Sequence, residues 1–315
     1  MKIKTKIFLS FVLSLPFGEG WGGASAQQLQ LNNQYLVNKF SLSPAYTGAS
    51  DNELFMSYRK NWAGISGAPE MANVSANGSI NRNMGVGINA GSQQQGIFRN
   101  AFASLNYAYN IDITDMQSIR FGVSGGFINN YINLSGSKSQ SVGDPVVAVN
   151  QNINKTTFDV NTAILYRFQN FNIGVVVPQI LENKVSENSN TIYTAKRHFV
   201  AHISYNFNVN ESWQIAPLAI ARKTLESPLM YEAAALIKYQ KQVWLGVTYR
   251  KANGMGISAG ANAFKNKFIV NYSYEFSSQG LAGNSNGTHE ITLGYVISKN
   301  KFQNDPKKPY IKWVE

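Results

Sequence analysis

The stretch Phe158–Val177 (FDVNTAILYRFQNFNIGVVV) constrains the fold of this chain more than any other. From Phe158 to Phe168 the alternate side chains suit an apolar medium, whereas Asp159 and Arg167 lie on the opposite face. A period of two is typical of a β-strand that has one face against an apolar environment and the other against water. The pair Gln169-Asn170 then predicts a tight turn into a second strand.

The same alternation recurs along the chain at intervals of roughly 8–14 residues, as in all-β proteins. We expect strands near residues 52–60, 71–80, 84–92, 97–109, 117–129, 157–168, 171–178, 197–208, 212–222, 229–239, 242–250, 254–264, 267–277 and 289–298. The expected fold is therefore all-β: a transmembrane outer-membrane antiparallel β-barrel of about 14 strands.

The connections between these segments fall into two alternating sets. One set contains only short turns: 81–83, 111–116, 169–170, 209–211, 240–241 and 265–266. The other set contains all the long ones (61–70, 130–156, 179–196 and 278–288) together with three short ones (93–96, 223–228 and 251–253). Outer-membrane barrels have short periplasmic turns and longer outer loops. The set that contains the long connections is therefore expected at the end of the barrel that faces outward. An exposed partner-binding loop is expected at 130–156.

The N-terminal residues predict that the chain is exported. Lysines precede an apolar run in residues 1–26, which end in an Ala-Ser-Ala site typical of signal-peptide cleavage. No later stretch reaches the ~18–20 apolar residues of a membrane-spanning helix. We therefore expect a signal peptide at 1–26, a periplasmic pre-barrel segment at 27–50, the barrel at 51–299 and a periplasmic tail at 300–315. The expected location is the outer membrane, as a multi-pass barrel.

Composition agrees with this assignment. Charged residues make up 14% of the chain, against about 25% in soluble proteins. The chain has no cysteine, which excludes disulfides, thiolate metal sites and cysteine nucleophiles. Aromatic residues are expected to form a girdle near the short turns; its members are Tyr166, Phe168, Tyr205, Phe207, Tyr239, Tyr274 and Phe276.

Several short motifs carry a family resemblance. They are Gln34-Tyr35, Ser43-Pro44-Ala45-Tyr46-Thr47-Gly48, Tyr58-Arg59-Lys60-Asn61-Trp62-Ala63-Gly64, Gly67-Ala68-Pro69, the hairpin from Phe158 to Leu181, Arg197-His198-Phe199, Trp244-Leu245-Gly246-Val247-Thr248-Tyr249-Arg250, Tyr272-Ser273-Tyr274-Glu275 and Thr288-His289-Glu290-Ile291. The order and spacing of these motifs resemble those of the PorP/SprF outer-membrane proteins, which belong to the type IX secretion and gliding-motility machinery in Bacteroidetes. The resemblance implies support for export or surface attachment of a secreted partner such as an adhesin, beside periplasmic motor-linked ring subunits.

The inward strand face carries charges of both signs. The candidate lumen-wall charges are Arg120, Asp159, Arg167, Glu232, Lys238, Arg250 and Glu275. A selective pore would show one dominant sign, whereas mixed charges can pair across the lumen. A filled or plugged interior is therefore the default, although the sequence leaves an open lumen possible. Outer-membrane lipid is an expected partner, and nucleic acid is not, despite a net charge of +11.

Two further groups of residues are candidates for contacts at the barrel ends. In the loop 61–70, the residues Trp62, Ile65 and Pro69 are expected to fold inward as a lid over the lumen, in preference to direct partner contact. At the other end, docking to periplasmic subunits is expected through Tyr35, Pro44, Tyr46, Lys307, Lys308 and Trp313.

The sequence offers little for catalysis. The three histidines are His198, His202 and His289. On one strand His198 and His202 lie about 13 Å apart, too far to share a metal whose ligand nitrogens lie ~2.1 Å away. We expect no cofactor, no metal site and no enzymatic activity. A membrane hydrolase using a serine beside a histidine is a remote alternative, and a transport channel for a small solute is the second hypothesis.

Overall fold

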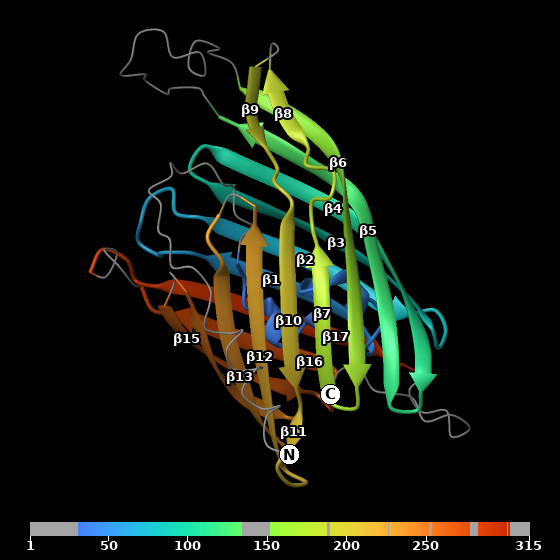
Figure 1. The fold of residues 1–315 in the computed structure, drawn as a ribbon. Helices are drawn as coiled ribbons and strands as arrows, with labels where there is room; N and C mark the ends of the chain where they lie inside the picture. Colours follow the sequence, from blue (N-terminus) through green and yellow to red (C-terminus); the bar gives the residue numbers. More distant parts are fainter. Residues whose placement is uncertain are drawn as a thin grey trace, which may run out of the picture.

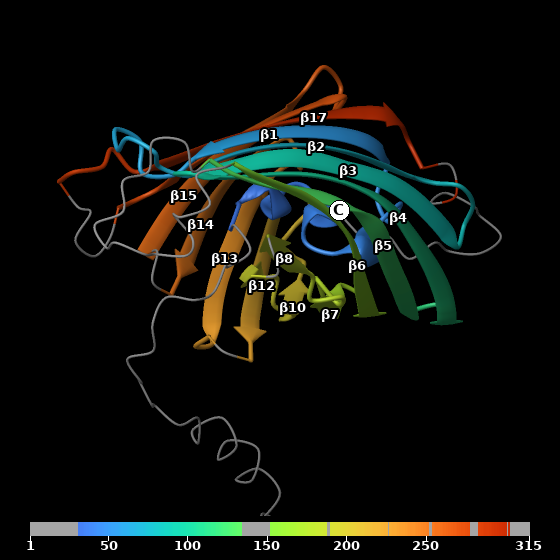
Figure 2. The same ribbon diagram turned by 90° about the horizontal axis from the view of Figure 1, so that it is seen from above.

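The protein is a closed antiparallel β-barrel of 14 strands in a computed structural model that describes residues 31–133, 152–187, 190–225, 227–251, 254–277, 283–300 and 302. Figure 1 shows the barrel from the side and Figure 2 along its axis. The strands are β1 (Asn52–Lys60), β2 (Glu70–Ser79), β3 (Met84–Gln95), β4 (Phe98–Thr114), β5 (Gln117–Ile132), β6 (Ile153–Phe168), β7 (Phe171–Val177), β8 (Lys184–Glu187), β9 (Asn190–Thr194), β10 (His198–Tyr205), β11 (Phe207–Asn208), β12 (Trp213–Thr224), β13 (Met230–Tyr239), β14 (Val243–Arg250), β15 (Gly254–Ala263), β16 (Phe268–Glu275) and β17 (Thr288–Ser298). The expected barrel and its strand number are confirmed.

Closure of the barrel depends on two pairings. The first and last strands, β1 and β17, pair antiparallel from Asn52 opposite Ser298 to Lys60 opposite His289. The ring is completed where β10 pairs with β12, and the two-residue β11 continues β10 along the same neighbour. A closed sheet leaves no strand edge unpaired, which is a requirement in lipid because the hydrocarbon offers no hydrogen-bond partner.

One structural element was not expected. The loop 179–196 contains the separate hairpin of β8 and β9, which extends beyond the barrel rim in Figure 1. We call this rim, which carries the connections β1–β2, β7–β10 and β16–β17, the long-loop end. The opposite rim, with turns such as Gln169-Asn170, is the short-turn end. The loop 130–156 lies mostly outside the described residues.

The outer face of the barrel is apolar. Strand β14 shows the alternation clearly, since Leu245 is 67% exposed while its neighbour Trp244 is 7% exposed. In a soluble protein a continuous exposed apolar face would be a liability, whereas in a bilayer it contacts the acyl chains. Among the described residues, no helix is long and apolar enough to span a bilayer.

Aromatic side chains do gather at the short-turn end. Trp213 packs on Tyr239 with ring centroids 4.8 Å apart, and Phe268 packs on Tyr295 at 5.0 Å. The placement of Tyr274 and Phe276 in this girdle is wrong. Strand β16 starts at the short-turn end with Phe268, so its last residues reach the long-loop end.

Residues 32–50, which we call the plug, lie inside the barrel. They form three short 3-10 helices, η1 (Gln34–Leu36), η2 (Lys39–Ser41) and η3 (Pro44–Tyr46). Figure 2 shows these helices (blue) enclosed by the ring of strands. Ser43 begins η3 as its N-cap, with its side chain accepting a hydrogen bond from the Ala45 amide at 3.2 Å. The lumen is therefore filled by the chain's own N-terminal segment.

Candidate functional site

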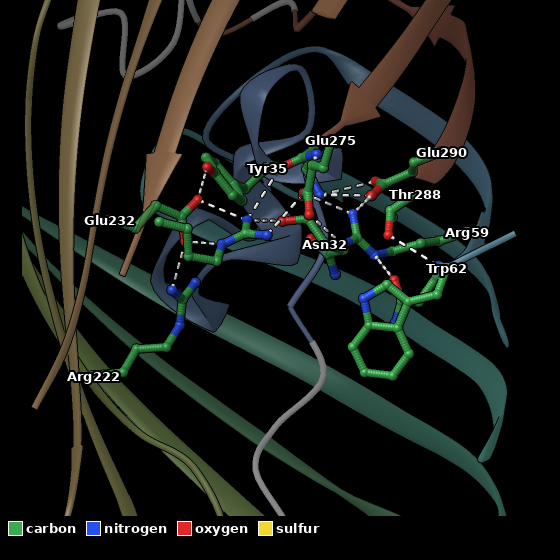
Figure 3. A network of polar contacts seen from close by, with 12 residues as sticks. Asn32, Tyr35, Arg59, Trp62, Arg222, Glu232, Glu275, Thr288 and Glu290 are labelled. Atoms are coloured by element: carbon green, nitrogen blue, oxygen red, sulfur yellow. Dashed lines mark hydrogen bonds and ion pairs between the residues drawn. The ribbon is translucent and has the colours of Figure 1, made fainter. Parts of the chain in front are cut away.

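A network of six charged side chains lines the lumen at the long-loop end (Figure 3). Its members, which we call the charged network, come from six strands: Arg222 on β12, Glu232 on β13, Arg250 on β14, Glu275 on β16, Glu290 on β17 and Arg59 on β1. Three arginines balance three glutamates, so the network as a whole is neutral. Burial of charges is tolerated only when they are paired and hydrogen-bonded.

Each guanidinium in the network contacts at least one carboxylate. Arg59 binds Glu275 through two nitrogens, at 2.8 and 3.0 Å, and contacts Glu290 at 2.9 Å. Arg250 bridges Glu275 at 2.8 Å and Glu232 at 2.9 and 3.0 Å. Bidentate pairing of this kind adds geometric specificity to the charge attraction.

Arg222 extends the network on one side, at 2.8 Å from Glu232. Its side chain is 15% exposed, against 3% for Arg250 and 4% for Arg59. The ion pairs thus link β12, β13, β14, β16, β17 and β1 along one side of the lumen.

The plug is bound directly to this network. The backbone N–H of Asn33 donates to both carboxylate oxygens of Glu290, at 2.8 and 3.0 Å, and its side-chain amide donates to Glu275 at 2.7 Å. The hydroxyl of Tyr35 donates to Glu232. Burial, followed by the nearby Glu232 charge, raises the pKa of Tyr35 well above its usual value, so this hydroxyl keeps its proton.

Glycines on the barrel wall make room for the rest of the plug. A β-carbon on Gly122 of β5 would lie 2.3 Å from the Ala45 nitrogen, and one on Gly85 of β3 would lie 2.1 Å from the Thr47 carbonyl oxygen. Only a residue without a side chain allows backbone to approach this closely. Arg120 also donates to the Thr47 carbonyl, so the wall contributes a hydrogen bond at the same place.

The plug also packs against apolar side chains. Tyr35, Leu36, Ala45, Tyr46 and Ala49 form one buried cluster with inward residues of the wall, namely Ala163, Leu165, Val176, Val200, Leu218, Ile220, Ala234, Leu236 and Trp244. The ring of Tyr46 lies 5.7 Å from that of His202. The plug therefore contacts both charged and apolar side chains of the wall, and Tyr35 contacts both kinds.

All seven candidate lumen-wall charges lie on the inner face. Arg120, Asp159, Arg167, Glu232, Arg250 and Glu275 are buried and Lys238 is half-buried. The structure brings only Glu232, Arg250 and Glu275 together in the charged network. Arg167 instead donates to the carbonyl of Gln169 at the short-turn end, at 2.5 Å.

Sequence reasoning missed the other three members of the network, Arg59, Arg222 and Glu290. A signal was available, because each stands at an inward position of a regularly alternating strand. In β1, for example, Arg59 is 3% exposed between the more exposed Tyr58 and Lys60.

The candidate lid residues lie at the long-loop rim. Trp62 and Ile65 are half-buried and Pro69 is buried. The backbone N–H of Trp62 donates to the hydroxyl of Thr288 at 3.2 Å, which holds the loop against β17 beside the charged network (Figure 3).

The expected periplasmic docking through the N-terminal segment is wrong for this conformation. Tyr35 is 1% exposed and Tyr46 is 3% exposed, because both side chains are packed inside the barrel. Pro44 is half-buried in the same plug. The remaining docking candidates, Lys307, Lys308 and Trp313, lie outside the described residues.

The described residues contain no group of three or more histidine, aspartate, glutamate or cysteine side chains arranged to hold a metal. Cavities remain between the plug and the wall. One of about 320 Å³ lies toward the long-loop end, and one of about 450 Å³ lies toward the short-turn end. The second is lined by Lys39 of the plug and by Lys238 and Lys241 of the wall.

A closed barrel with an apolar outer face and a lumen filled by its own N-terminal segment defines a membrane-spanning barrel of the outer-membrane type. Within that class, the family model of the type IX secretion system membrane protein PorP/SprF matches residues 24–295, so the chain belongs to this family. The family is described as a membrane protein of the type IX secretion system.

The chain is also similar to solved structures. The toluene transporter TbuX of Ralstonia pickettii is 9% identical, with a TM-score of 0.50, covering 87% of this chain and 95% of that one. The monoaromatic hydrocarbon channel CymD is 14% identical, with a TM-score of 0.49, covering 89% and 96%. No curated protein matches the chain significantly.

Proposed function

We propose that this barrel is an outer-membrane platform of the type IX secretion and gliding machinery, which supports export or surface attachment of a secreted partner such as an adhesin. The observation that carries the proposal is the plugged lumen. A plug held by paired charges, glycine contacts and an apolar cluster fits a component that binds a partner better than one that conducts solutes.

In this proposal the long-loop end faces outward and contacts the secreted partner, with Trp62, Ile65 and Pro69 covering the lumen beneath. The short-turn end faces the periplasmic ring subunits. Because the plug side chains are buried, docking there is left to the tail 300–315, in particular to Lys307, Lys308 and Trp313. Cleavage of residues 1–26 as a signal peptide is part of the same proposal, as is a Bacteroidetes source.

A deletion strain tests the proposal. Loss of the gene should leave the partner unsecreted or released into the medium, and the full chain should restore its surface location. A chain that ends after Phe302 should reach the outer membrane at the same level and yet fail to restore the partner. A partner distribution that is unchanged by the deletion would rule out the platform role.

A solute channel is the second candidate, favoured by the two cavities on either side of the plug. Planar-bilayer conductance separates the two functions. A platform should show no stable open pore, whereas a channel should show reproducible conductance that a permeating solute blocks.

A further inference from the structure

The cavity of about 320 Å³ near the long-loop end has an unusual lining. It lies between plug residues 32–44 and the inner faces of β2–β7 and β10, and Arg222 of the charged network also lines it. Its polar side chains are mostly neutral amides: Asn73, Asn89, Asn100, Asn106, Asn130 and Asn161. The surface thus presents many donors and acceptors with little charge.

Two charged residues line this cavity, Asp159 and Arg222. The guanidinium of Arg222 is already engaged by Glu232 at 2.8 Å. Asp159 is 6% exposed, and the Oδ1 atom of its carboxylate has no hydrogen-bond partner in the structure.

Asn73 gives a second observation of the same kind. Its amide nitrogen donates to Asn89 Oδ1 at 2.7 Å, which fixes the side chain, while its own Oδ1 is buried without a partner. Buried acceptors are almost always satisfied by protein, water or ligand. The two unsatisfied oxygens line the same cavity from β6 and β2, with β3–β5 between them, and each could accept a hydrogen bond from a donor-rich ligand.

The cavity also has apolar surface. Phe40 of the plug and Phe102 of β4 line it among the amides. A mainly neutral site with several convergent hydrogen-bonding groups and aromatic rings is typical of pockets that fix the orientation of an uncharged polar ligand.

We propose that this cavity binds a neutral saccharide. Sugar hydroxyls both donate and accept, as the asparagine amides do, and can donate to Asp159 and Asn73, while the carbon face of a sugar ring suits Phe40 or Phe102. A volume of about 320 Å³ is near the lower limit of ligand pockets, roughly 300–1,000 Å³. It holds a compact ligand of one or two rings better than an extended peptide. The proposal stands independently of the platform role.

The test uses the full chain purified in detergent and a panel of glucose, galactose, mannose, rhamnose, N-acetylglucosamine and their common disaccharides. Saturable binding of at least one sugar, with a Kd of about 1 mM or tighter, is expected by titration calorimetry or saturation-transfer NMR. Asp159→Asn keeps the shape and should weaken that binding at least tenfold, and Asn73→Ala should also weaken it.

Asn172→Ala is the matched control. Asn172 is also an inward asparagine with an unpartnered Oδ1, at 4% exposure, but it lines the cavity at the short-turn end. The Asn172→Ala variant should bind the sugar with unchanged affinity, and its barrel should unfold at the same urea concentration as the parent barrel. Absence of binding across the panel, or equal weakening by Asp159→Asn and Asn172→Ala, would overturn the proposal. So would tighter binding of extended peptides to the same cavity.

Discussion

Replacing Glu275 with glutamine should loosen the plug more than any other isosteric change in the lumen. This carboxylate accepts two hydrogen bonds from Arg59, one from Arg250 and one from Asn33, at 2.7–3.0 Å. Glutamine keeps the shape but places an amide donor where one carboxylate oxygen accepts. It also leaves three arginines, two of them buried, facing two glutamates.

The size of the effect follows from the remaining partners. Removing one member of a buried ion pair costs about 3–5 kcal/mol because a charge is left uncompensated. Here Arg59 still has Glu290 and Arg250 still has Glu232, so the lower value, about 3 kcal/mol, applies. At 1.4 kcal/mol for each factor of ten, the population with a displaced plug should rise about 100-fold.

Two assays follow the change. Urea unfolding in detergent or liposomes should show a lower midpoint for Glu275→Gln, and planar-bilayer recordings should show openings that are absent in the parent protein. The control is Glu70→Gln, the same substitution in the rim pair Lys60–Glu70, whose side chains are 38% and 41% exposed. An exposed pair contributes little to stability because water screens its charges, so this variant should behave like the parent.

A double variant sharpens the test. Adding Arg222→Gln to Glu275→Gln leaves two complete ion pairs, one on Arg59 and one on Arg250, and should recover part of the lost stability. If Glu275→Gln unfolds at the same urea concentration as Glu70→Gln and stays equally closed, the charged network does not hold the plug and the reasoning fails.

Two other variants probe the rest of the plug. Gly122→Val should lower the free energy of unfolding by about 1–3 kcal/mol, because a β-carbon there would lie 2.3 Å from the backbone nitrogen of Ala45. Gly125→Val, whose β-carbon would meet only a phenylalanine ring at 3.3 Å, should cost less, and equal effects of the two variants would contradict the glycine contact. Burial, followed by the charge of Lys238, lowers the pKa of Lys39 from 10.5 to about 7. Between about pH 7 and 10.5 the unfolded chain therefore binds one more proton at Lys39 than the folded chain does. The free energy of unfolding should rise with pH across this range. Lys39→Met should remove that rise in urea titrations, and an unchanged pH dependence would show that Lys39 is not desolvated.

The barrel itself could be predicted from local pattern. Each strand shows apolar and polar residues alternating with a period of two. The alternation of the two sets of connections along the chain, one of which contains only short turns, can also be seen in the sequence without knowledge of any contact. The fourteen expected segments each coincide with an observed strand, with ends that differ by at most five residues. The expected strand ends would have differed more from the observed ones only if turn residues had interrupted the segments.

The plug could not be predicted in the same way. Residues 32–50 have no sustained periodicity, and their contacts are with residues far away in sequence. Asn33, for example, binds Glu290 across a separation of 257 residues. Absence of periodicity is equally typical of a periplasmic linker, which is why Tyr35 and Tyr46 were expected on a docking surface.

A clue to the plug was nevertheless present on the inner faces of the strands. Leu165, Val200, Leu218 and Leu236 all stand at inward positions and are at most 5% exposed. In a water-filled lumen such side chains would lose the free energy of apolar burial, about 25 cal/mol per Å². They are favourable only if another apolar surface covers them, and the barrel supplies that surface from its N-terminal segment. Inward apolar residues, together with paired inward charges near the long-loop end, therefore indicate an occupant that has both apolar and polar surface.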